Sequence, residues 1–316
     1  MSAGKPNMVA QRTAFGEALC ELGEEYKNLI VLDPDVSPST QTHLFGRKFP
    51  DRFFQVGIAE QNMAGIAAGL STQGFVPFVS AFAVFMVHRA GDQVRNSIAH
   101  PKANVKINGA YAGLPTGRSG ATHSSVEDLA VIRSLPNMII FDPADAREVA
   151  LFTRMAVETD GPVYLRTVRC EVPAVFGERH TVEMGKAVHL EDGKDITLIS
   201  SGMMTSRAIG AARELRNRGI SAGVIHMPVI KPLDEQAIVE AAHKTGKILT
   251  VENHSVIGGL GSAVCETTAD KAPCLVGRIG YQDIFLESGD DETLFSRYGM
   301  DARGIAERAE QMVRQK

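Results

Sequence analysis

Glu60 occupies a position where a carboxylate could do chemistry. A β-like run over residues 53–56 breaks at Gly57, and a helix rich in small and apolar residues follows. Glu60 therefore falls near a helix start just after a strand, where α/β folds usually present functional side chains. Because a carboxylate is costly to bury unpaired, Glu60 lies at the surface, is paired structurally, or is held for a ligand. The competing interpretation is a surface Glu that the helix dipole favours.

His123 is a second candidate, at the end of a loop with glycines at positions 109, 113, 117 and 120. These glycines allow close approach to a ligand, but their spacing matches no nucleotide-binding fingerprint. Ser124 or Ser125 could cap a following helix and so place His123 at its N-terminus. The helix dipole disfavours a protonated ring there, so a neutral imidazole could donate a hydrogen bond or carry a proton.

Alternating strands and helices must position these side chains. The predicted strands are 29–32, 75–82, 104–107, 138–141, 163–165, 196–199, 222–225 and 248–251, and the predicted helices include 11–25, 84–99, 144–158, 205–218, 234–242 and 302–313. The fold class is therefore α/β, with two doubly wound domains, each a mainly parallel sheet flanked by helices. The pattern weakens after residue 172, so we predict domains at 1–180 and 195–316 and a linker at 181–194.

The composition excludes several classes of function. The 316 residues are 44% hydrophobic and 22% charged, with a formal net charge of -4, which is typical of a soluble globular protein and gives no reason to expect nucleic acid or a membrane as partner. The cysteines and histidines show no metal-ligand spacing, so we predict no metal site on this chain. The first residues are polar and lack the apolar core of a signal peptide, which favours a cytoplasmic protein.

Several segments together resemble transketolase-like thiamine diphosphate enzymes. They are 55–70 (QVGIAEQNMAGIAAGL), 74–82 (GFVPFVSAF), 89–95 (RAGDQVR), 122–130 (THSSVEDLA), 251–254 (VENH), 258–262 (GGLGS), 285–289 (FLESG) and 298–300 (YGM). The resemblance covers essentially the whole chain, but only the second part of a full transketolase. It implies a pyrimidine-binding domain followed by a transketolase C-terminal domain, the latter serving assembly rather than chemistry.

The resemblance also implies a cofactor and a partner. The family binds Mg²⁺ and the diphosphate through a Gly-Asp-Gly motif in a separate N-terminal domain, and no such motif occurs here. We therefore infer a split enzyme whose N-terminal subunit carries the diphosphate-binding domain, in an assembly with two copies of each chain (α2β2). The reaction implied is transfer of a two-carbon ketol unit between a ketose and an aldose, or their phosphates.

Individual roles follow only from this resemblance. Glu60 would hydrogen-bond the pyrimidine and favour the imino tautomer that activates the thiazolium carbon. Phe85 is the first choice for the ring that stacks on the pyrimidine, and Phe82 is the second; core packing is the alternative for either. His123 would bind substrate oxygens and assist proton transfer.

The remaining implied contacts concern the substrate. Arg169, rather than Arg166, matches an Arg that binds substrate phosphate, and Arg12 and Ser39 resemble two further phosphate contacts. Tyr111 stands where many transketolases have a second substrate-binding His, and Arg118 with its neighbour Ser119 replaces an acidic pair. These two departures predict an acceptor that differs from the ordinary pentose-pathway sugars or carries an extra anionic group.

Two other functions stay open at this point. The β-subunit of a 2-oxoacid dehydrogenase shares the two-domain plan and the cofactor half-site. A non-catalytic assembly subunit is also compatible with a chain that lacks the diphosphate motif.

Overall fold

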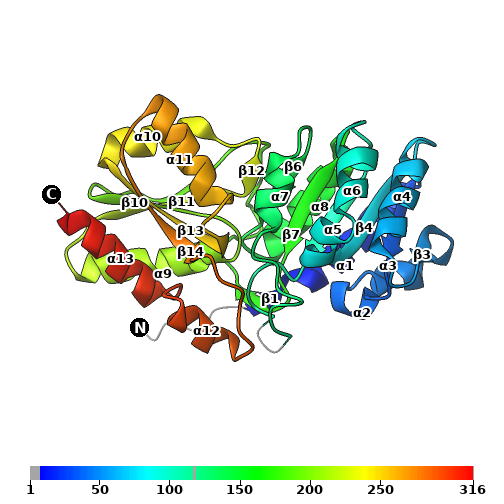
Figure 1. The fold of residues 1–316 in the computed structure, drawn as a ribbon, viewed down its shortest axis with the longest axis horizontal. Coiled ribbons are helices and arrows are strands. Elements are labelled where there is room, and N and C mark those ends of the chain that lie inside the picture. Colours follow the sequence, from blue (N-terminus) through cyan, green and yellow to red (C-terminus); the bar gives the residue numbers. More distant parts are fainter. Residues whose placement is uncertain (1–7, 117–118, 316) are drawn as a thin grey trace. The chain divides into compact units, whose positions relative to one another are not determined.

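The computed structural model describes residues 8–116 and 119–315, which form two compact units (Figure 1). The first unit draws on Met1–Ala112 and Ser134–Val182, and the second on Gly113–Arg133 and Glu183–Lys316. The predicted domain 1–180 includes the loop Gly113–Arg133, whereas the structure groups this loop with the second unit. The boundaries of the two domains stay a prediction.

The first unit contains a parallel sheet in the order β6-β7-β5-β4-β2-β3. Its strands are β2 (Leu29–Asp33), β3 (Phe53–Gln55), β4 (Val76–Phe82), β5 (Lys106–Ala110), β6 (Ile139–Phe141) and β7 (Val163–Thr167). A separate antiparallel pair joins β1 (Met8–Ala10) to β8 (Glu171–Pro173). β2, β4, β5 and β7 are buried along their whole length, as expected for parallel strands covered on both faces.

Helices cover this sheet in two groups (Figure 1). They are α1 (Gln11–Glu25), α2 (Ser37–Thr40), α3 (His43–Lys48), α4 (Glu60–Ser71), α5 (Ala83–His88), α6 (Gly91–Gln93) and α8 (Ala146–Glu158), with a 3-10 turn η1 (Pro50–Arg52) and a π-helical turn η2 (Val94–Ala99). α1 packs against α3 and α8, whereas α4 packs against β4, α6 and η2. The helix predicted over 11–25 is confirmed as α1.

The single helix predicted over 84–99 is wrong. Ala90 leaves the helical region at φ -98° and ψ 9°, so the chain forms α5, α6 and η2 in its place. The backbone N–H of Ala90 reaches back to the carbonyl of Phe85 at 3.2 Å, and Gly91 begins the next turn. This break places Arg89 at the end of α5, directly before a change of chain direction.

The second unit contains a sheet in the order β14-β13-β10-β11-β9, parallel except for the edge strand β9. Its strands are β9 (Val188–Glu191), β10 (Ile196–Ser200), β11 (Ala222–His226), β13 (Lys247–Ser255) and β14 (Leu275–Tyr281), with β12 (Val229–Lys231) following β11. Its helices are α9 (Met204–Asn217), α10 (Glu235–Thr245), α11 (Leu260–Lys271), α12 (Asp291–Arg297) and α13 (Ala302–Arg314), and it also holds nearly all of α7 (Asp128–Ser134). α9 packs against α13, and α10 packs against α11. The predicted α/β class with mainly parallel sheets is confirmed.

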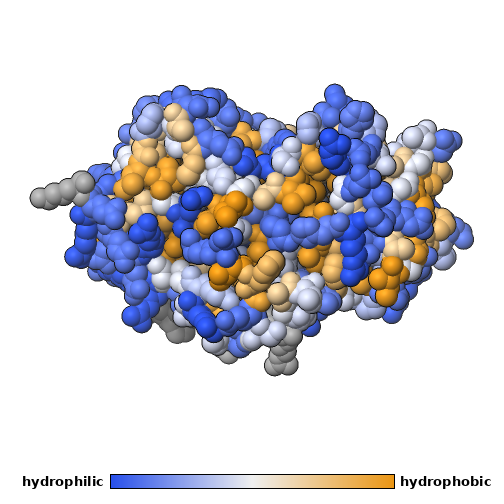
Figure 2. Space-filling view, viewed as in Figure 1, coloured by the Kyte–Doolittle hydropathy of each residue, from blue (hydrophilic) through white to orange (hydrophobic). Residues whose placement is uncertain are grey.

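Hydrophobic side chains also reach the surface among hydrophilic ones (Figure 2). In the first unit the exposed apolar residues include Phe54, Ile58 and Ile66, and in the second they include Phe285. Ile58 lies two residues before Glu60, so part of this apolar surface borders the candidate site.

Candidate active site

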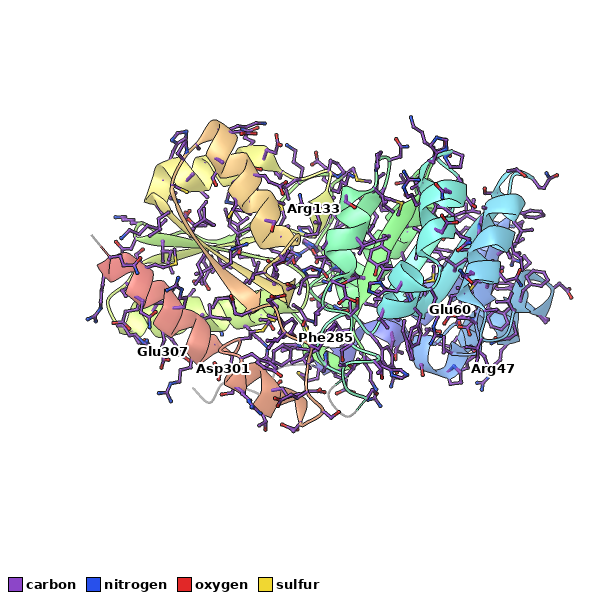
Figure 3. The ribbon with its side chains drawn as sticks, in the orientation of Figure 1. Arg47, Glu60, Arg133, Phe285, Asp301 and Glu307 are labelled. Atoms are coloured by element: carbon purple, nitrogen blue, oxygen red, sulfur yellow. The ribbon has the colours of Figure 1, made fainter. Side chains whose placement is uncertain are left out.

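Glu60 is the first residue of α4, in the first unit (Figure 3). Gly57 has a positive φ of 73°, which a glycine adopts without strain, and the N–H of Ala59 donates to its carbonyl at 2.7 Å. This tight turn carries the chain from β3 into the helix and turns the Glu60 side chain inward, where only 5% of it is exposed. The helix N-terminus favours the negative charge.

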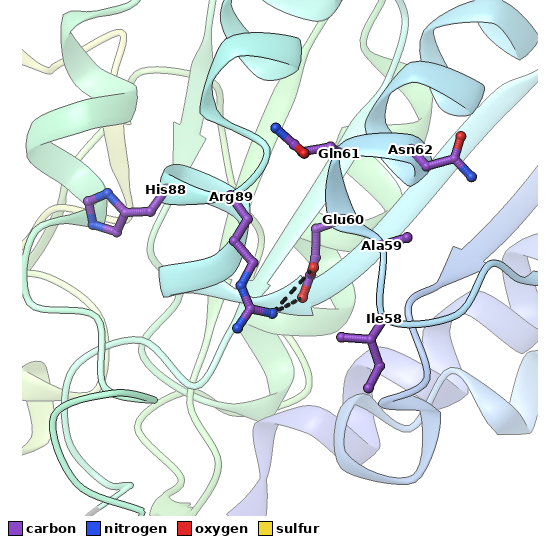
Figure 4. A pocket seen from close by; sticks show the side chains of 7 residues that line it. All are labelled: Ile58, Ala59, Glu60, Gln61, Asn62, His88 and Arg89. Carbon is purple, nitrogen blue, oxygen red and sulfur yellow. Dashed lines mark hydrogen bonds and ion pairs between the residues drawn. The ribbon is translucent and has the colours of Figure 1, made fainter.

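Arg89 is the ion-pair partner of Glu60. Its Nη1 lies 3.1 Å from Oε1 and 3.5 Å from Oε2 of the carboxylate, and Figure 4 shows the two side chains pointing toward one another. The guanidinium carbon of Arg89 also lies 3.9 Å from the centre of the Phe85 ring. Half of the Arg89 side chain is exposed, so water weakens this ion pair.

A cavity of about 810 Å³ opens beside this pair (Figure 4). It is lined by Ile58, Ala59, Glu60, Gln61, Asn62, His88 and Arg89. The buried carboxylate and the Phe85 ring together suit a planar group that carries N–H donors. The guanidinium of Arg89 is itself such a group and already makes both contacts, so the residues present fit an aminopyrimidine.

Phe85, Phe82 and Tyr111 form a row of contacting aromatic rings inside the first unit. The Phe85 and Phe82 ring centres are 5.7 Å apart, and Phe82 stacks on Tyr111 with centres 4.3 Å apart. Phe82 and Tyr111 are buried, whereas Phe85 is only partly buried. Phe85 is therefore the ring better placed to receive a ligand, and Phe82 supports it from inside the cluster.

Two guanidinium groups lie beside Tyr111. Nη1 of Arg12 donates to the Tyr111 hydroxyl at 3.4 Å and to the carbonyl of Ser39 at 3.5 Å, and the Arg169 guanidinium lies 5.7 Å from the Tyr111 ring centre. Arg169 is exposed, whereas Arg166 is buried and pairs with Asp142 at 3.1 Å. The structure thus brings Arg12, Arg169 and Tyr111 together as a potential anion site.

His123 belongs to the second unit. Its Nδ1 lies 2.8 Å from the Thr122 hydroxyl, and its backbone N–H donates to the carbonyl of Gly120 at 3.1 Å. The helix start expected after Ser124 or Ser125 is wrong, because α7 (Asp128–Ser134) begins only at Asp128 and His123 lies in a turn before it. The dipole argument for a neutral ring therefore does not apply. Arg118 lies outside the described residues.

Residues 8–116 and 119–315 contain neither a metal-binding cluster nor a membrane-spanning helix. No group of three or more His, Cys, Asp or Glu side chains in that part of the chain could hold a metal ion. Over the same residues, no helix has the length and apolar character needed to cross a membrane.

Comparison with known families assigns both halves of the chain. Residues 7–174 match the pyrimidine-binding domain of transketolase, and residues 185–305 match the transketolase C-terminal domain. The chain belongs to the transketolase family. The predicted fold and the predicted resemblance are both confirmed.

Individual relatives sharpen this assignment. A putative transketolase C-terminal section of Methanocaldococcus jannaschii is 43% identical over 300 residues, which cover 94% of each chain. An apulose-4-phosphate transketolase subunit of Phocaeicola vulgatus is 40% identical over 309 residues, covering 98% of this chain and 99% of that one. A solved split-gene transketolase, an inactive β4 tetramer, has a TM-score of 0.89 at 45% identity and covers 97% of this chain and 99% of its own.

These transketolase relatives correspond to this chain over nearly their whole length. The chain is therefore a transketolase-type transferase subunit, and the transketolase family depends on thiamine diphosphate. The 2-oxoacid dehydrogenase and non-catalytic alternatives are not favoured.

Arg89 is a member of the Glu60 site that was not predicted from the sequence. Arg89 follows Phe85 by four residues, a spacing that places two side chains of one helical turn together. A cation at this spacing after a candidate stacking ring is the signal that could have found it.

Proposed function

We propose that this chain supplies the pyrimidine-binding half of a thiamine diphosphate site and transfers a two-carbon ketol unit between sugar phosphates together with a separate N-terminal subunit. The observation that supports this most is the buried Glu60 carboxylate, at a helix start, facing a planar cation that stacks on Phe85. Thiamine diphosphate, when bound, would supply the electron sink for breaking the carbon–carbon bond.

Glu60 would accept a hydrogen bond from a pyrimidine nitrogen, and Phe85 would stack on the ring. For this, the Arg89 guanidinium must move aside. Half of the Arg89 side chain is exposed, so water weakens its pair with Glu60, and the pyrimidine N–H would replace the guanidinium as the partner of the buried carboxylate. Phe82 would keep Phe85 in place through their ring contact.

His123 would hydrogen-bond substrate oxygens and carry a proton during transfer. Arg12 and Arg169 would bind the substrate phosphate beside Tyr111, because guanidinium groups match phosphate oxygens in charge and geometry. Ser39 contributes its backbone carbonyl to holding Arg12. The relative from Phocaeicola vulgatus is named for a phosphorylated sugar, which supports a phosphate-binding role for these cations.

The N-terminal subunit would hold the diphosphate and Mg²⁺, in an α2β2 assembly in the cytoplasm. The names "C-terminal section" and "split gene" among the relatives support a separate partner chain. Tyr111 and Arg118 support an acceptor sugar other than the ordinary pentose-pathway substrates.

Reconstitution tests this proposal. The chain is mixed with an N-terminal transketolase subunit, thiamine diphosphate and Mg²⁺, and transfer from a ketose phosphate to a panel of aldose phosphates is measured. We expect transfer by the mixture and none by either chain alone. Decarboxylation of a 2-oxoacid with reduction of an artificial electron acceptor, and no ketol transfer, would contradict it.

A further inference from the structure

The end of β13 contacts the loop that carries His123, and both belong to the second unit. We propose that Asn253 and His254 are positioning residues that hold this loop so that His123 meets the substrate. The inference rests on the proposed role of His123. It gives the C-terminal domain a part in catalysis, beyond the assembly role that the resemblance implies.

Asn253 holds the start of the loop through its side-chain amide. Its Oδ1 accepts the N–H of Leu114 at 3.0 Å and the Tyr281 hydroxyl at 2.7 Å, and its Nδ2 donates to the Leu114 carbonyl. Gly113 has a φ of 61°, and a Cβ there would overlap the Asn253 side chain. The amide therefore pairs with both backbone groups of Leu114, which holds the backbone at the start of the loop in place.

His254 holds the other end of the loop. Its Nε2 accepts the backbone N–H of Leu129 at 3.1 Å and of Ala130 at 3.4 Å, at the start of α7. Its Nδ1 lies 2.7 Å from the Ser255 carbonyl. Because Nε2 accepts, Nδ1 carries the proton and donates to that carbonyl, so the ring is neutral in this arrangement. The ring is fully buried.

Further contacts tie the loop to itself on both sides of His123. The N–H of Ser255, next to His254, donates to the Val126 carbonyl at 2.7 Å. The N–H of Gly113 donates to the Ser125 carbonyl at 2.7 Å and closes the base of the loop. Above this base the Ser124 hydroxyl donates to the Gly120 carbonyl at 3.1 Å. His123 thus lies within a closed stretch of backbone whose base is held by β13.

A group that delivers a hydrogen bond or a proton must lie within a fraction of an ångström of its working position. Removing a side chain that holds such a group in place therefore lowers turnover. Asn253 contacts the loop through a buried amide without itself carrying a titratable group. Its removal should therefore affect turnover through His123 and leave the chemistry of His123 itself unaltered.

A double-mutant cycle in the complex with the N-terminal subunit tests this inference. We expect Asn253→Ala to lower kcat by about tenfold in the wild-type background and by less than about twofold in the His123→Ala background, because the position of a missing side chain no longer matters. Thr205→Val is the matched control, since Thr205 is also buried in the same unit but pairs with Ser200 and His226. Equal losses in both backgrounds would overturn the inference.

Hydrogen exchange on the chain alone provides a readout that does not depend on activity. Asn253→Ala should speed exchange in residues 113–116 and 119–133 and leave the strands of the first unit unchanged. If Asn253→Ala fails to fold, Tyr281→Phe removes one contact to the amide without opening the core, and should act in the same direction more weakly. If His123→Ala leaves turnover intact, the proposed role of His123 fails. Unchanged exchange in both Asn253→Ala and Tyr281→Phe would overturn the proposal that Asn253 holds the loop.

Discussion

Glu60 and Glu252 are both buried carboxylates beside a helix N-terminus, one in each unit. Glu60 pairs with the half-exposed Arg89 and lines an open cavity. Glu252 accepts the backbone N–H of Leu260 at 2.7 Å and of Gly261 at 2.8 Å, and a Cβ on Gly259 would overlap it. Both oxygens of Glu252 accept hydrogen bonds from backbone N–H groups at the start of α11, so Glu252 stabilises the fold.

The contrast also separates two parts of the family resemblance. Within the segments 251–254 and 258–262, Glu252 accepts two backbone N–H groups at the start of α11 and so stabilises the second unit. The segment 55–70 instead presents a carboxylate to a cavity. One resembling segment therefore holds backbone groups of the second unit, and the other places a carboxylate in the wall of a cavity in the first unit.

The largest expected effect on stability comes from Glu252. Glu252→Ala leaves two buried N–H groups without this acceptor, which should lower the free energy of unfolding by about 2–6 kcal/mol. Glu60→Gln keeps the side-chain volume and weakens only a half-exposed ion pair, so we expect a change of about 1 kcal/mol or less. Urea unfolding of both variants measures the difference, and equal losses would remove the distinction between the two carboxylates.

Replacing His123 should lower turnover without changing the affinity of the complex for thiamine diphosphate. His123→Ala is expected to lower kcat by about 100-fold, the usual size of a lost proton-transfer group, with unchanged affinity for thiamine diphosphate. Steady-state kinetics and calorimetric titration of the two-subunit complex measure the two quantities. A kcat equal to that of the wild type would exclude His123 from catalysis.

Lys106 is a buried basic residue that, like Glu252, hydrogen-bonds to backbone groups. Its amine donates to the carbonyls of Thr159 and Gly161, both at 2.6 Å, and burial lowers its pKa to about 7. The unfolded chain, with a pKa of about 10.4 at this group, binds more protons between these two values, so stability should rise with pH from about 7 to about 10.

Replacing Lys106 tests this pH dependence. Relative to Lys106→Met, the wild type should gain up to about 1.4 kcal/mol per pH unit in urea unfolding between about pH 7 and pH 9. A pH-independent difference between the two proteins would show that Lys106 titrates in the folded protein as it does in the unfolded chain.

Local patterns in the sequence were enough to place Glu60. The strand, the glycine and the helix occur in succession within a few residues, and α1 and α4 follow the expected periodicity. The break at Ala90 was missed because the helical periodicity continues past Gly91, the one helix-ending signal there, and Arg89 was missed with it. The helix after His123 was expected to start directly after Ser124 or Ser125, because both serines resemble caps, whereas α7 begins at Asp128.

The anchors of the His123 loop could not be found from spacing. Asn253 contacts Leu114 across 139 positions, and His254 contacts Leu129 across 125. Such pairs depend on how β13 and the loop meet in the folded second unit, and a histidine or an asparagine at the end of a strand carries no local sign of its partner. The roles of Asn253 and His254 therefore follow only from the folded structure.

Turnover of the Glu60→Gln variant tests the central claim most directly. The variant chain is assembled with the N-terminal subunit, the assembly is verified by its mass, and ketol transfer is measured at saturating thiamine diphosphate and Mg²⁺. If Glu60 serves the pyrimidine, transfer should fall by at least about 100-fold while assembly and stability are retained. Transfer at the wild-type rate in the intact complex would contradict the claim that this chain provides the pyrimidine-binding half of the site.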